Sequence, residues 1–596
     1  MRRPADFRGT FRDDDAARAV YAEAAGIARV VPLAVAVPAD VADVVALARW
    51  ASATETPLVP RGSGSSMAGG AIGPGVIVDL SRLDAIGPVD DAARRVRTGP
   101  GALCGAVDAA ARRHGLRLPP DPSSGKFCTV GGMASTNAAG AHSLRYGAMR
   151  QWVVALDCVF ADGTRAELRR GAPAPEGVPP IERFLRDVRP ALLAHESARP
   201  SVHHGVRKDS SGYAIADYAR SGDLVDLVVG SEGTLALIVG LELALAPVPG
   251  ATSSALAAFP TLEGAVEAAV LAREAPGAGA SACELLDRTF LDVVASGASL
   301  VNGGGAASAA SAASAASAAS AGGSPEIPAD TEAVLLAEVE GRDLEDAVER
   351  ARALGALFER AGASQVTLAL DDVTEPALWE LRHAASPVLA RLDPALKSMQ
   401  FIEDGAVPPE RVPDYVRGVR AALARRGVRG VIFGHAGDAH IHVNPLVDVR
   451  DPDWRAKVAG LLDDVVALTA RLGGTLAGEH GDGRLRTPLL ERVWPGETRA
   501  LFERVKGSFD PVGVLNPGVI VPVAGQRAID DVKYDPALPP LPPAARAVLD
   551  RVERERAYAR SRLALLDEVS AAPSSGDGRS ATIRDASPLD GSPLAP

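Results

Sequence analysis

Two short segments in the C-terminal half contain four of the ten histidines of the chain and carry its clearest chemical pattern. The first runs from Gly434 to Asn444 and the second from Gly478 to Gly483. Imidazole and carboxylate side chains together can hold a divalent metal and leave one position open for substrate. A further histidine beside such a metal is a candidate general base. The alternative is a set of hydrogen-bonded histidines on a buried strand, but the glycines at each bend favour the metal site.

Length, charge and cysteine content restrict the class of protein. A chain of 596 residues is too long for one hydrophobic core, so two or three domains are expected. A net charge of −12 argues against a nucleic-acid partner. The four cysteines form no CxxC motif, so the sequence predicts neither an iron–sulfur cluster nor a zinc ribbon. With no apolar signal or membrane-spanning stretch, we expect a cytoplasmic protein, and peripheral attachment to the inner face of the membrane stays open.

The elements that must position these residues follow an α+β pattern. In the N-terminal half, β-rich runs at 30–38, 76–80, 153–160 and 235–239 alternate with glycine-rich turns, and a helix is expected from Asp43 to Ala51. The pattern changes near residues 247–250, after which strands alternate with long helices. The helices expected there span Leu262–Glu274, Leu344–Ala361, Val412–Arg426 and Trp454–Leu472.

The pattern divides the chain into five parts. An N-terminal extension (1–28) precedes a first domain (29–248) and a second domain (249–522). The second domain contains an Ala/Ser-rich insertion (303–324) that offers nothing to bury, and we interpret it as a solvated surface loop. A C-terminal extension (523–570) is expected to contain one charged helix, from about 544 to 567, and residues 571–596 have the composition of a disordered tail.

Three glycine-rich segments in the N-terminal half are typical of phosphate-binding loops. Residues 60–70 fail the dinucleotide-binding fingerprint because Met67 stands at the third glycine position. The other segments are 119–140 and 230–235. Backbone N–H groups and small hydroxyls in such loops suit a pyrophosphate. Each segment alone is typical of a plain turn, but together they predict a large phosphate-bearing cofactor lying across several loops.

These three segments resemble the FAD-binding domain of the vanillyl-alcohol oxidase/p-cresol methylhydroxylase (PCMH) type. Glu403-Asp404, His435–Asn444, Gly478–Gly483 and Phe509–Gly518 resemble the C-terminal domain of the FAD-linked D-2-hydroxyacid dehydrogenases. That branch includes D-lactate dehydrogenase, D-2-hydroxyglutarate dehydrogenase and the flavoprotein subunit of glycolate oxidase. The resemblance covers residues 29–522, apart from the insertion. It implies an α+β chain with a two-subdomain PCMH-type FAD-binding domain followed by a C-terminal α+β cap domain for substrate and metal.

The resemblance implies a role for individual residues. It assigns His435, His442 and Glu479 as ligands of a divalent metal, Zn²⁺ or Mn²⁺, and His480 as the catalytic base. The substrate-contacting positions are Arg382, Ser386, Lys397 and Asn444, although charge alone would put Arg382 and Lys397 in ordinary surface salt bridges. The FAD-contacting positions are Arg61, Gly62, Ser63, Gly64, Ser65, Ser66, Pro120, Asp121, Ser123, Ser124, Gly131, Gly132, Ser135, Thr136, Asn137, Gly140, Glu232, Gly233, Thr234 and Asn516.

The implied reaction is oxidation of a D-2-hydroxy acid, of the D-lactate, glycolate or D-2-hydroxyglutarate class, to the 2-oxo acid. The metal would lower the pKa of the hydroxyl group, and His480 would take its proton. Arg382 and Lys397 would hold the carboxylate, and FAD would accept the hydride. A quinone, an electron-transfer protein or a cytochrome would take the electrons. A separate iron–sulfur subunit and a homodimer are the other partners that the resemblance suggests.

Three features depart from the family pattern. Ala439-His440 stands where the family usually has Gly-Asn, so His440 is either an extra supporting group or a competing ligand. Asp482 replaces a commonly apolar residue. No histidine lies between Arg61 and Gly70, where some flavoproteins of this fold attach FAD covalently, so we expect non-covalent FAD.

Other functions remain alternatives at this point. Within the same fold, the runner-up is an FAD-dependent oxidase that reduces O₂ and acts on a sugar or lactone alcohol. From other classes, the metal motif could belong to a hydrolase, or the chain could be a binding protein with a degenerate site. The glycine-rich N-terminal half argues against the hydrolase, and the intact histidines and Glu479 argue against the binding protein.

Overall fold

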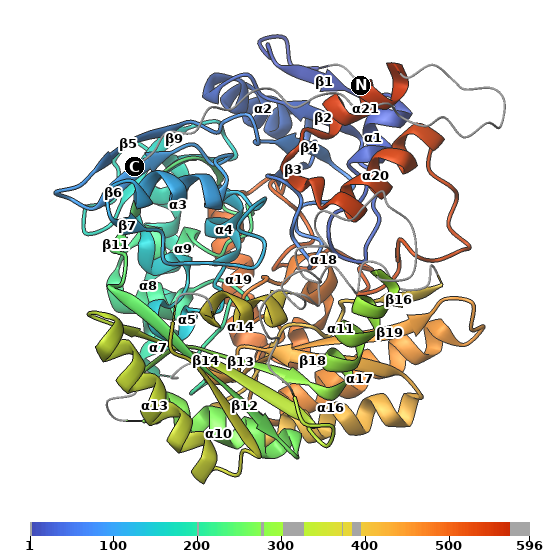
Figure 1. The fold of residues 1–596 in the computed structure, drawn as a ribbon. Helices are drawn as coiled ribbons and strands as arrows, with labels where there is room; N and C mark the ends of the chain where they lie inside the picture. The colour runs from blue at the N-terminus through green and yellow to red at the C-terminus, as the bar shows by residue number, and fades with distance from the viewer. Residues whose placement is uncertain are drawn as a thin grey trace, which may run out of the picture.

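The computed structural model describes residues 3–198, 202–275, 279–301, 327–371, 374–383 and 395–571. The Ala/Ser-rich insertion, Ser386 and residues 572–596 of the predicted tail lie outside the described residues. Across the described parts the chain forms three main sheets with helices packed on them, an α+β architecture as predicted (Figure 1).

The first sheet has the strand order β1-β2-β4-β3 and is covered on both faces. Alternate residues of a strand point to opposite faces. Ala34 and Ala36 pack with α2, while Val35 and Val37 pack with α1 and with two helices from the C-terminal end of the chain. The N-terminal extension therefore belongs to this sheet, to which it contributes β1 and α1. The elements are β1 (Thr10–Arg12), α1 (Asp15–Val20), β2 (Ala34–Val37), α2 (Val41–Thr54), β3 (Leu58–Arg61) and β4 (Val76–Asp79).

The second sheet is antiparallel, with the strand order β5-β6-β10-β8-β9. Its strands are β5 (Ile86–Asp90), β6 (Arg95–Thr98), β8 (Val153–Val159), β9 (Arg165–Arg169) and β10 (Leu237–Ala244). The helices that share its core are α3 (Cys104–Arg112), α4 (Val130–Thr136), α6 (Pro179–Arg183), α7 (Arg189–Ala198), α8 (Ile215–Ser221) and α9 (Leu224–Val228). A small pair, β7 (Leu116–Arg117) with β11 (Ala246–Pro247), and the short helix α5 (Ser143–Tyr146) complete this part.

The third sheet has the order β15-β12-β14-β13-β18-β19-β16, and β17 pairs with β19 beside it. Its strands are β12 (Ala251–Phe259), β13 (Ala280–Asp287), β14 (Ala333–Gly341), β15 (Gln365–Ala369), β16 (Leu396–Ser398), β17 (Gly405–Ala406), β18 (Arg429–Gly434) and β19 (His440–Asp448). One face packs on α10 (Leu262–Glu274), α13 (Leu344–Arg360), α16 (Val412–Arg426) and α17 (Trp454–Arg471), and the other on α11 (Arg288–Val301) and α14 (Thr374–His383). The four predicted helices of this part are confirmed to within one residue.

After the third sheet the chain returns to the N-terminal half. The short helix α18 (Gly483–Arg486) leads to α19 (Gly496–Phe509), whose Phe502 and Phe509 lie in the core of the second sheet. Leu515 then bridges to Leu58 at the edge of the first sheet. The last part of the second domain therefore completes the hydrophobic core of the first domain, and the two domains share that core.

The prediction of one charged helix in the C-terminal extension is wrong. The segment forms two helices, α20 (Pro543–Glu555) and α21 (Arg562–Ala571), separated at Arg556, which has a φ of 52°. Both pack on α1 against the first sheet through apolar residues such as Val548 and Leu566 (Figure 1). Since neither glycine nor proline marks the break, helix propensity gave no signal for it.

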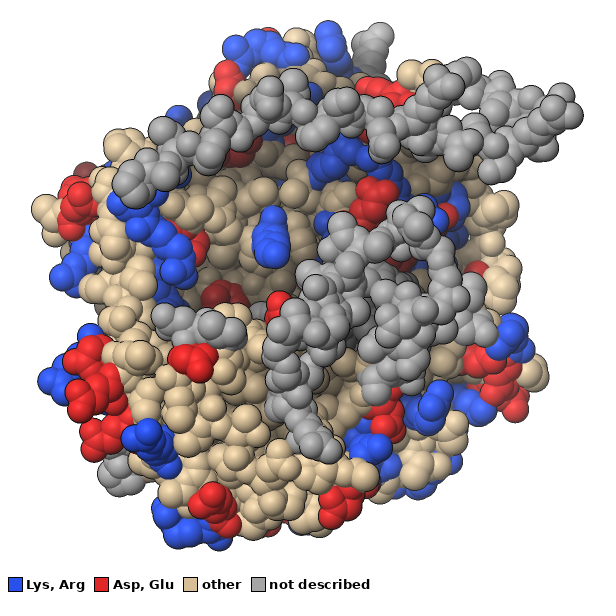
Figure 2. Space-filling view, in the orientation of Figure 1, with Lys and Arg blue, Asp and Glu red and all other residues tan. Residues whose placement is uncertain are grey.

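The face drawn in Figure 2 is hollowed in the middle, between the N-terminal sheets and the third sheet. Among the described residues, no helix combines the length and the apolar character that a bilayer crossing requires.

Candidate active site

The β18–β19 hairpin of the third sheet presents the first histidine motif. The turn between the strands contains Ala439 in a left-handed conformation, with φ of 59°. Because alternate residues of a strand share a face, His440, His442 and Asn444 lie along one side of β19. The intervening Ile441 and Val443 are buried in the core on the other side. The sequence pattern thus places the polar residues toward the N-terminal half.

The loop that carries Glu479 and His480 is fixed by Asp404. The carboxylate of Asp404 accepts hydrogen bonds from the backbone N–H groups of Glu479 (3.2 Å) and His480 (3.0 Å), and its carbonyl accepts one from Gly478 (2.8 Å). A Cβ on Gly478 would lie 2.6 Å from the His440 ring, so only glycine lets the loop approach the hairpin this closely. Buried Arg486 forms ion pairs with both Glu403 and Asp404 and anchors the acidic pair.

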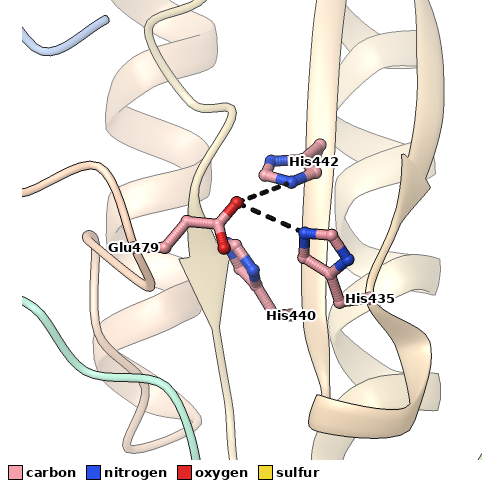
Figure 3. A group of neighbouring side chains, drawn as sticks. All are labelled: His435, His440, His442 and Glu479. Atoms are coloured by element: carbon pink, nitrogen blue, oxygen red, sulfur yellow. Dashed lines mark hydrogen bonds and ion pairs between the residues drawn. The ribbon is translucent and has the colours of Figure 1, made fainter. Parts of the chain in front are cut away.

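His435, His442 and Glu479 converge on one point (Figure 3). Nδ1 of His435 donates to Glu284 (2.6 Å) and Nδ1 of His442 donates to the carbonyl of Glu403 (2.7 Å). Each ring therefore turns its Nε2 atom toward Glu479, at 3.3 Å from His435 and 3.5 Å from His442. Two oriented imidazoles and a carboxylate are the donor set of an open divalent metal site, and the residues present fit Zn²⁺ or Mn²⁺.

His440 belongs to the same group. Its Nε2 pairs with Asp404 at 2.8 Å, while its buried Nδ1 has no partner among the described residues. One potential ligand atom from each of His435, His440, His442 and Glu479 lies within 4.8 Å of the others. Burial lowers the pKa of His440 to about 3, so the ring is neutral and able to offer a lone pair. Both roles that the sequence left open for His440 are compatible with this geometry.

His480 stacks on His442 with ring centroids 5.5 Å apart and lines the central cavity. Its Nδ1 lies 3.4 Å from Glu403, and its Nε2 lies 3.7 Å from Glu479. Burial alone would lower the pKa of His480, but Asp404, Glu403 and Glu479 outweigh burial and raise it to about 9. These carboxylates therefore favour the protonated form of the His480 ring.

Lys208, which the sequence analysis did not single out, contacts Glu479, one of the predicted metal ligands. Its Nζ lies 2.9 Å from Oε2 of Glu479 and donates to the carbonyl of Gly140 at 3.2 Å. Burial would raise the pKa of Glu479, but Lys208 and His435 outweigh it and hold this pKa well below its ordinary value. Lys208 thus joins a glycine-rich segment of the first domain to the metal group of the second.

Arg382, Lys397 and Asn444 all line the cavity. The side chains of Arg382 and Lys397 are each held in place by a neighbouring residue. Nε of Arg382 donates to Glu284 at 2.6 Å, and its guanidinium stacks on Phe433 at 5.1 Å. Lys397 lies over the ring of Tyr534, at 5.1 Å. Arg382 therefore forms a buried salt bridge with Glu284, the residue that orients His435. It does not form the surface ion pair that its charge alone suggested.

The glycine-rich segments meet the metal group around one cavity of about 640 Å³, a size typical of a cofactor site. Of the predicted FAD-contacting residues, those on its wall are Arg61, Gly62, Ser63, Gly64, Ser65, Ser66, Asp121, Ser123, Ser124, Gly131, Gly132, Ser135, Thr136, Gly140, Glu232 and Gly233. Pro120, Asn137, Thr234 and Asn516 lie behind the wall. Asn516, for example, donates to the carbonyls of Gly70 (3.0 Å) and Glu232 (2.8 Å).

Close contacts at these segments require glycine at two points. A Cβ on Gly62 would lie 2.2 Å from the Thr129 hydroxyl, and a Cβ on Gly140 would lie 2.5 Å from the backbone of Asp121. Glycine at 62 therefore lets the first segment pack on the second, and glycine at 140 lets the two ends of the second segment pack together. The guanidinium of Arg61 is turned away to the carbonyls of Tyr21, Glu23 and Ala71, and so supports the loop.

The third glycine-rich segment is tied to the metal loop by two buried acids. Glu232 accepts backbone hydrogen bonds from Asp482 (2.7 Å) and Gly483 (3.2 Å). Asp482 accepts from Gly212 N (2.7 Å) and the Ser211 hydroxyl (2.9 Å). Burial raises the pKa of Asp482 to about 6, and burial together with Asp482 raises that of Glu232 to about 8. The unusual acid at 482 therefore has a structural role between the domains.

His142 is a second residue that sequence reasoning missed. Its ring bridges Asp121 of the first domain and Glu338 of the second (2.8 Å) and stacks on Trp379 at 5.7 Å. Burial would lower the pKa of His142, but the two carboxylates raise it well above its ordinary value. No local sequence signal marks His142, Lys208 or Glu284, because each finds its partner far away in the chain.

Comparison with known proteins gives the class of this chain. The FAD binding domain family matches residues 32–169, and the C-terminal domain of the FAD linked oxidases matches residues 248–520. The chain belongs to this family of FAD-linked oxidoreductases, and within it to the hydroxyacid dehydrogenase type.

Among its relatives, glycolate oxidase subunit GlcD of Bacillus subtilis is 27% identical over 85% of this chain and 93% of that protein. D-lactate dehydrogenase of Archaeoglobus fulgidus is 28% identical over 81% of this chain and 90% of that protein. D-2-hydroxyglutarate dehydrogenase of Pseudomonas putida is 30% identical over 87% of this chain, which spans about half (51%) of that relative.

Solved structures confirm the PCMH-type fold. The 4-ethylphenol oxidase from Gulosibacter chungangensis aligns with a TM-score of 0.60 at 16% identity, covering 86% of this chain and 94% of that one. p-Cresol methylhydroxylase aligns with a TM-score of 0.58 at 12% identity and the same coverage. At this identity the likeness concerns the fold alone.

Proposed function

We propose that this protein oxidises a D-2-hydroxy acid of the D-lactate, glycolate or D-2-hydroxyglutarate class to the 2-oxo acid, with a divalent metal and non-covalent FAD. The observation that carries the proposal is the convergence of His435, His442 and Glu479, with both Nε2 atoms turned toward the carboxylate, on the wall of the cavity that the glycine-rich segments form. A hydrolase needs no dinucleotide cofactor, so it has no use for the glycine-rich segments.

His435, His442 and Glu479 would hold the metal, and the glycine-rich segments would hold FAD. When bound, the metal supplies a Lewis acid for the substrate hydroxyl, and the flavin accepts the hydride. Lys397 and Arg382 attract and orient the substrate carboxylate, and Asn444 offers an amide beside them. The names of the relatives support this class, because glycolate, D-lactate and D-2-hydroxyglutarate all carry a hydroxyl next to a carboxylate.

His480 is the group that takes the hydroxyl proton in this proposal. Its Nδ1 faces the carboxylates of Glu403 and Asp404, which hold a proton on that atom, so Nε2 is the atom left to act as base. The negative charge of Glu479 favours the protonated ring. A metal held by His435, His442 and Glu479 would offset this charge and so would favour the neutral form of His480, which can accept a proton.

The electrons must leave through a separate acceptor, for which a quinone, an electron-transfer protein or a cytochrome would serve. The four cysteines are all buried and unpaired, and none belongs to a cluster-binding motif. A separate iron–sulfur subunit fits this requirement, and the homodimer stays a prediction. A cytoplasmic location also stays a prediction of the sequence.

Anaerobic mixing of the purified protein with individual hydroxy acids tests the proposal. We expect D-lactate, glycolate or D-2-hydroxyglutarate to bleach the flavin absorbance, and the L enantiomers of the chiral acids to leave it. His435→Ala should retain FAD but lose bleaching and metal, whereas His114→Ala, a change at a surface histidine, should lose neither. Acid precipitation should release all flavin into the supernatant.

Two results would contradict the proposal. Thoroughly metal-depleted protein that still bleaches at the full rate would remove the metal from the mechanism. Bleaching by sugars or lactones, coupled to O₂ consumption and absent with hydroxy acids, would favour the alternative oxidase.

A further inference from the structure

The turn between the C-terminal helices α20 and α21 reaches the central cavity, although both helices lie beyond the last residue that the family models match, residue 520. The turn between them, residues 556–561, passes beside the first and second glycine-rich segments. Arg556 and Tyr558 of this turn lie on the cavity wall together with Ser63 and Ser124. Nothing in the family pattern assigns a role to these residues.

Arg556 presents a positive charge without a counter-ion. Its guanidinium stacks on Phe127, with Cζ 5.0 Å from the ring centre, and the side chain is half-buried. In the part of the chain that the structure describes, no acceptor forms a hydrogen bond or ion pair with it. Burial lowers the pKa of Arg556, and Tyr558 opposes this effect only in part. A cation held this way needs an anionic partner, and the cavity is where that partner can enter.

Tyr558 and Arg562 continue the same surface. The Tyr558 ring packs on Phe127 with centroids 5.3 Å apart, and the Arg562 guanidinium lies 5.3 Å above Tyr558. Arg562 donates to the carbonyl of Ser63 at 3.2 Å, while its buried Nε has no partner among the described residues. A second cavity of about 190 Å³ opens between Tyr558 and Arg61, and it shares Gly62, Ser63 and Thr129 with the main cavity.

We propose that the α20–α21 hairpin is part of the FAD site and that Arg556 binds the diphosphate of the cofactor. The guanidinium fork matches phosphate oxygens, and it faces the cavity beside the loops whose N–H groups and hydroxyls suit the same anion. Arg562 acts as a positioning residue because it holds the Ser63 carbonyl. This inference rests on the FAD part of the proposed function and is independent of the substrate.

Contacts that do not involve Arg556 also dock the hairpin. Val548 and Val552 of α20 are buried in the core shared with α1, and Arg546 forms an ion pair with Glu23 at 3.0 Å. The contact of Arg556 itself is with Phe127, which holds the guanidinium over an aromatic ring on the cavity wall. This position suits a side chain that binds a ligand in the cavity.

FAD binding to apoprotein, followed by flavin fluorescence at several KCl concentrations, tests the inference. Arg556→Gln keeps a polar hydrogen-bonding side chain and removes its charge, and Arg556→Lys keeps the charge. Arg554→Gln, at an exposed arginine in the last turn of α20, is the matched control. We expect Arg556→Gln to weaken FAD binding at least about tenfold and to reduce its salt dependence, because a charge-assisted contact is lost. Arg556→Lys should lose less, and the control should match the native protein.

Three outcomes would overturn the inference. FAD affinity of Arg556→Gln within twofold of native would show that no diphosphate contact exists. Weaker binding with an unchanged salt dependence would assign the effect to packing. Unchanged FAD affinity with a raised KM for the hydroxy acid would indicate that Arg556 contacts the substrate and not FAD. Arg556-dependent FAD binding in a protein that oxidises no hydroxy acid would support this inference and contradict only the substrate proposal.

Discussion

Glu284→Gln is the substitution that tests most directly how the fold prepares the metal site. Glu284 is fully buried on β13, where one carboxylate oxygen accepts from His435 Nδ1 and the other from Arg382 Nε, both at 2.6 Å. Burial would raise the pKa of Glu284, but His435 and Arg382 outweigh it and hold the carboxylate ionised. Two acceptor oxygens therefore fix both partners at once.

Glutamine has one acceptor oxygen and one NH₂ donor. If its oxygen stays on Arg382, its NH₂ group faces His435, whose Nδ1 must then accept the hydrogen bond. The proton of His435 moves to Nε2, the atom that points at Glu479, and a protonated nitrogen cannot bind a metal. Loss of such an orienting partner typically weakens metal binding about 10- to 100-fold, or about 1.4–2.8 kcal/mol.

Competition with a chromogenic chelator would measure this affinity for Zn²⁺ or Mn²⁺, with FAD content determined on the same sample. We expect Glu284→Gln to lose metal affinity and keep FAD. Glu242→Gln, which removes a carboxylate paired with Arg169 at 2.8 Å far from the site, should change neither. Metal affinity within twofold of native in Glu284→Gln would refute the reasoning, because His435 would then not depend on its buried partner.

Three further predictions concern charge and the unusual histidine. Lys208→Met should destabilise the protein by up to about 3 kcal/mol in chemical denaturation, because buried Glu479 loses its lysine partner and keeps only its histidine partners; the double variant with Glu479→Gln should recover most of the loss, and no recovery would contradict the pairing. Burial raises the pKa of Asp287 to about 7, so this group stabilises the fold at low pH and that stabilisation is lost as pH rises from about 4 through 7. Asp287→Asn cannot ionise, so it should avoid this loss of up to about 4 kcal/mol in the free energy of unfolding. The Tm of the variant should exceed that of the native protein at pH 8 and by less at pH 5, and an equal difference in Tm at both pH values would contradict the prediction. His440→Asn should weaken metal binding about tenfold or more with FAD retained, whereas unchanged affinity would limit His440 to packing.

Local patterns predicted the second domain well. The helices at 262–274 and 412–426 were predicted to the residue, because apolar periodicity, an N-terminal cap or proline, and a final glycine or alanine-rich turn agree there. The C-terminal extension was harder, since the break at Arg556 depends on tertiary contacts with Phe127 and has no turn residue to announce it. The N-terminal extension likewise joins the first sheet through pairing that no local signal specifies.

The chemical groups that are available can be recognised in the amino-acid sequence: the histidines and Glu479 in two glycine-bounded segments, the phosphate-type loops, and their resemblance to an FAD-linked family. Those residues are close in the chain or belong to short motifs, so local spacing points to them and the resemblance suggests their roles. The partners of these residues become visible only in the folded chain. Glu284, Lys208 and His142 act on residues far away in sequence, and burial at the domain boundary fixes their charge and orientation. Pairs of polar side chains that are far apart in the chain produce no periodic pattern in the sequence. Each pair forms only after the separate sheets have packed together.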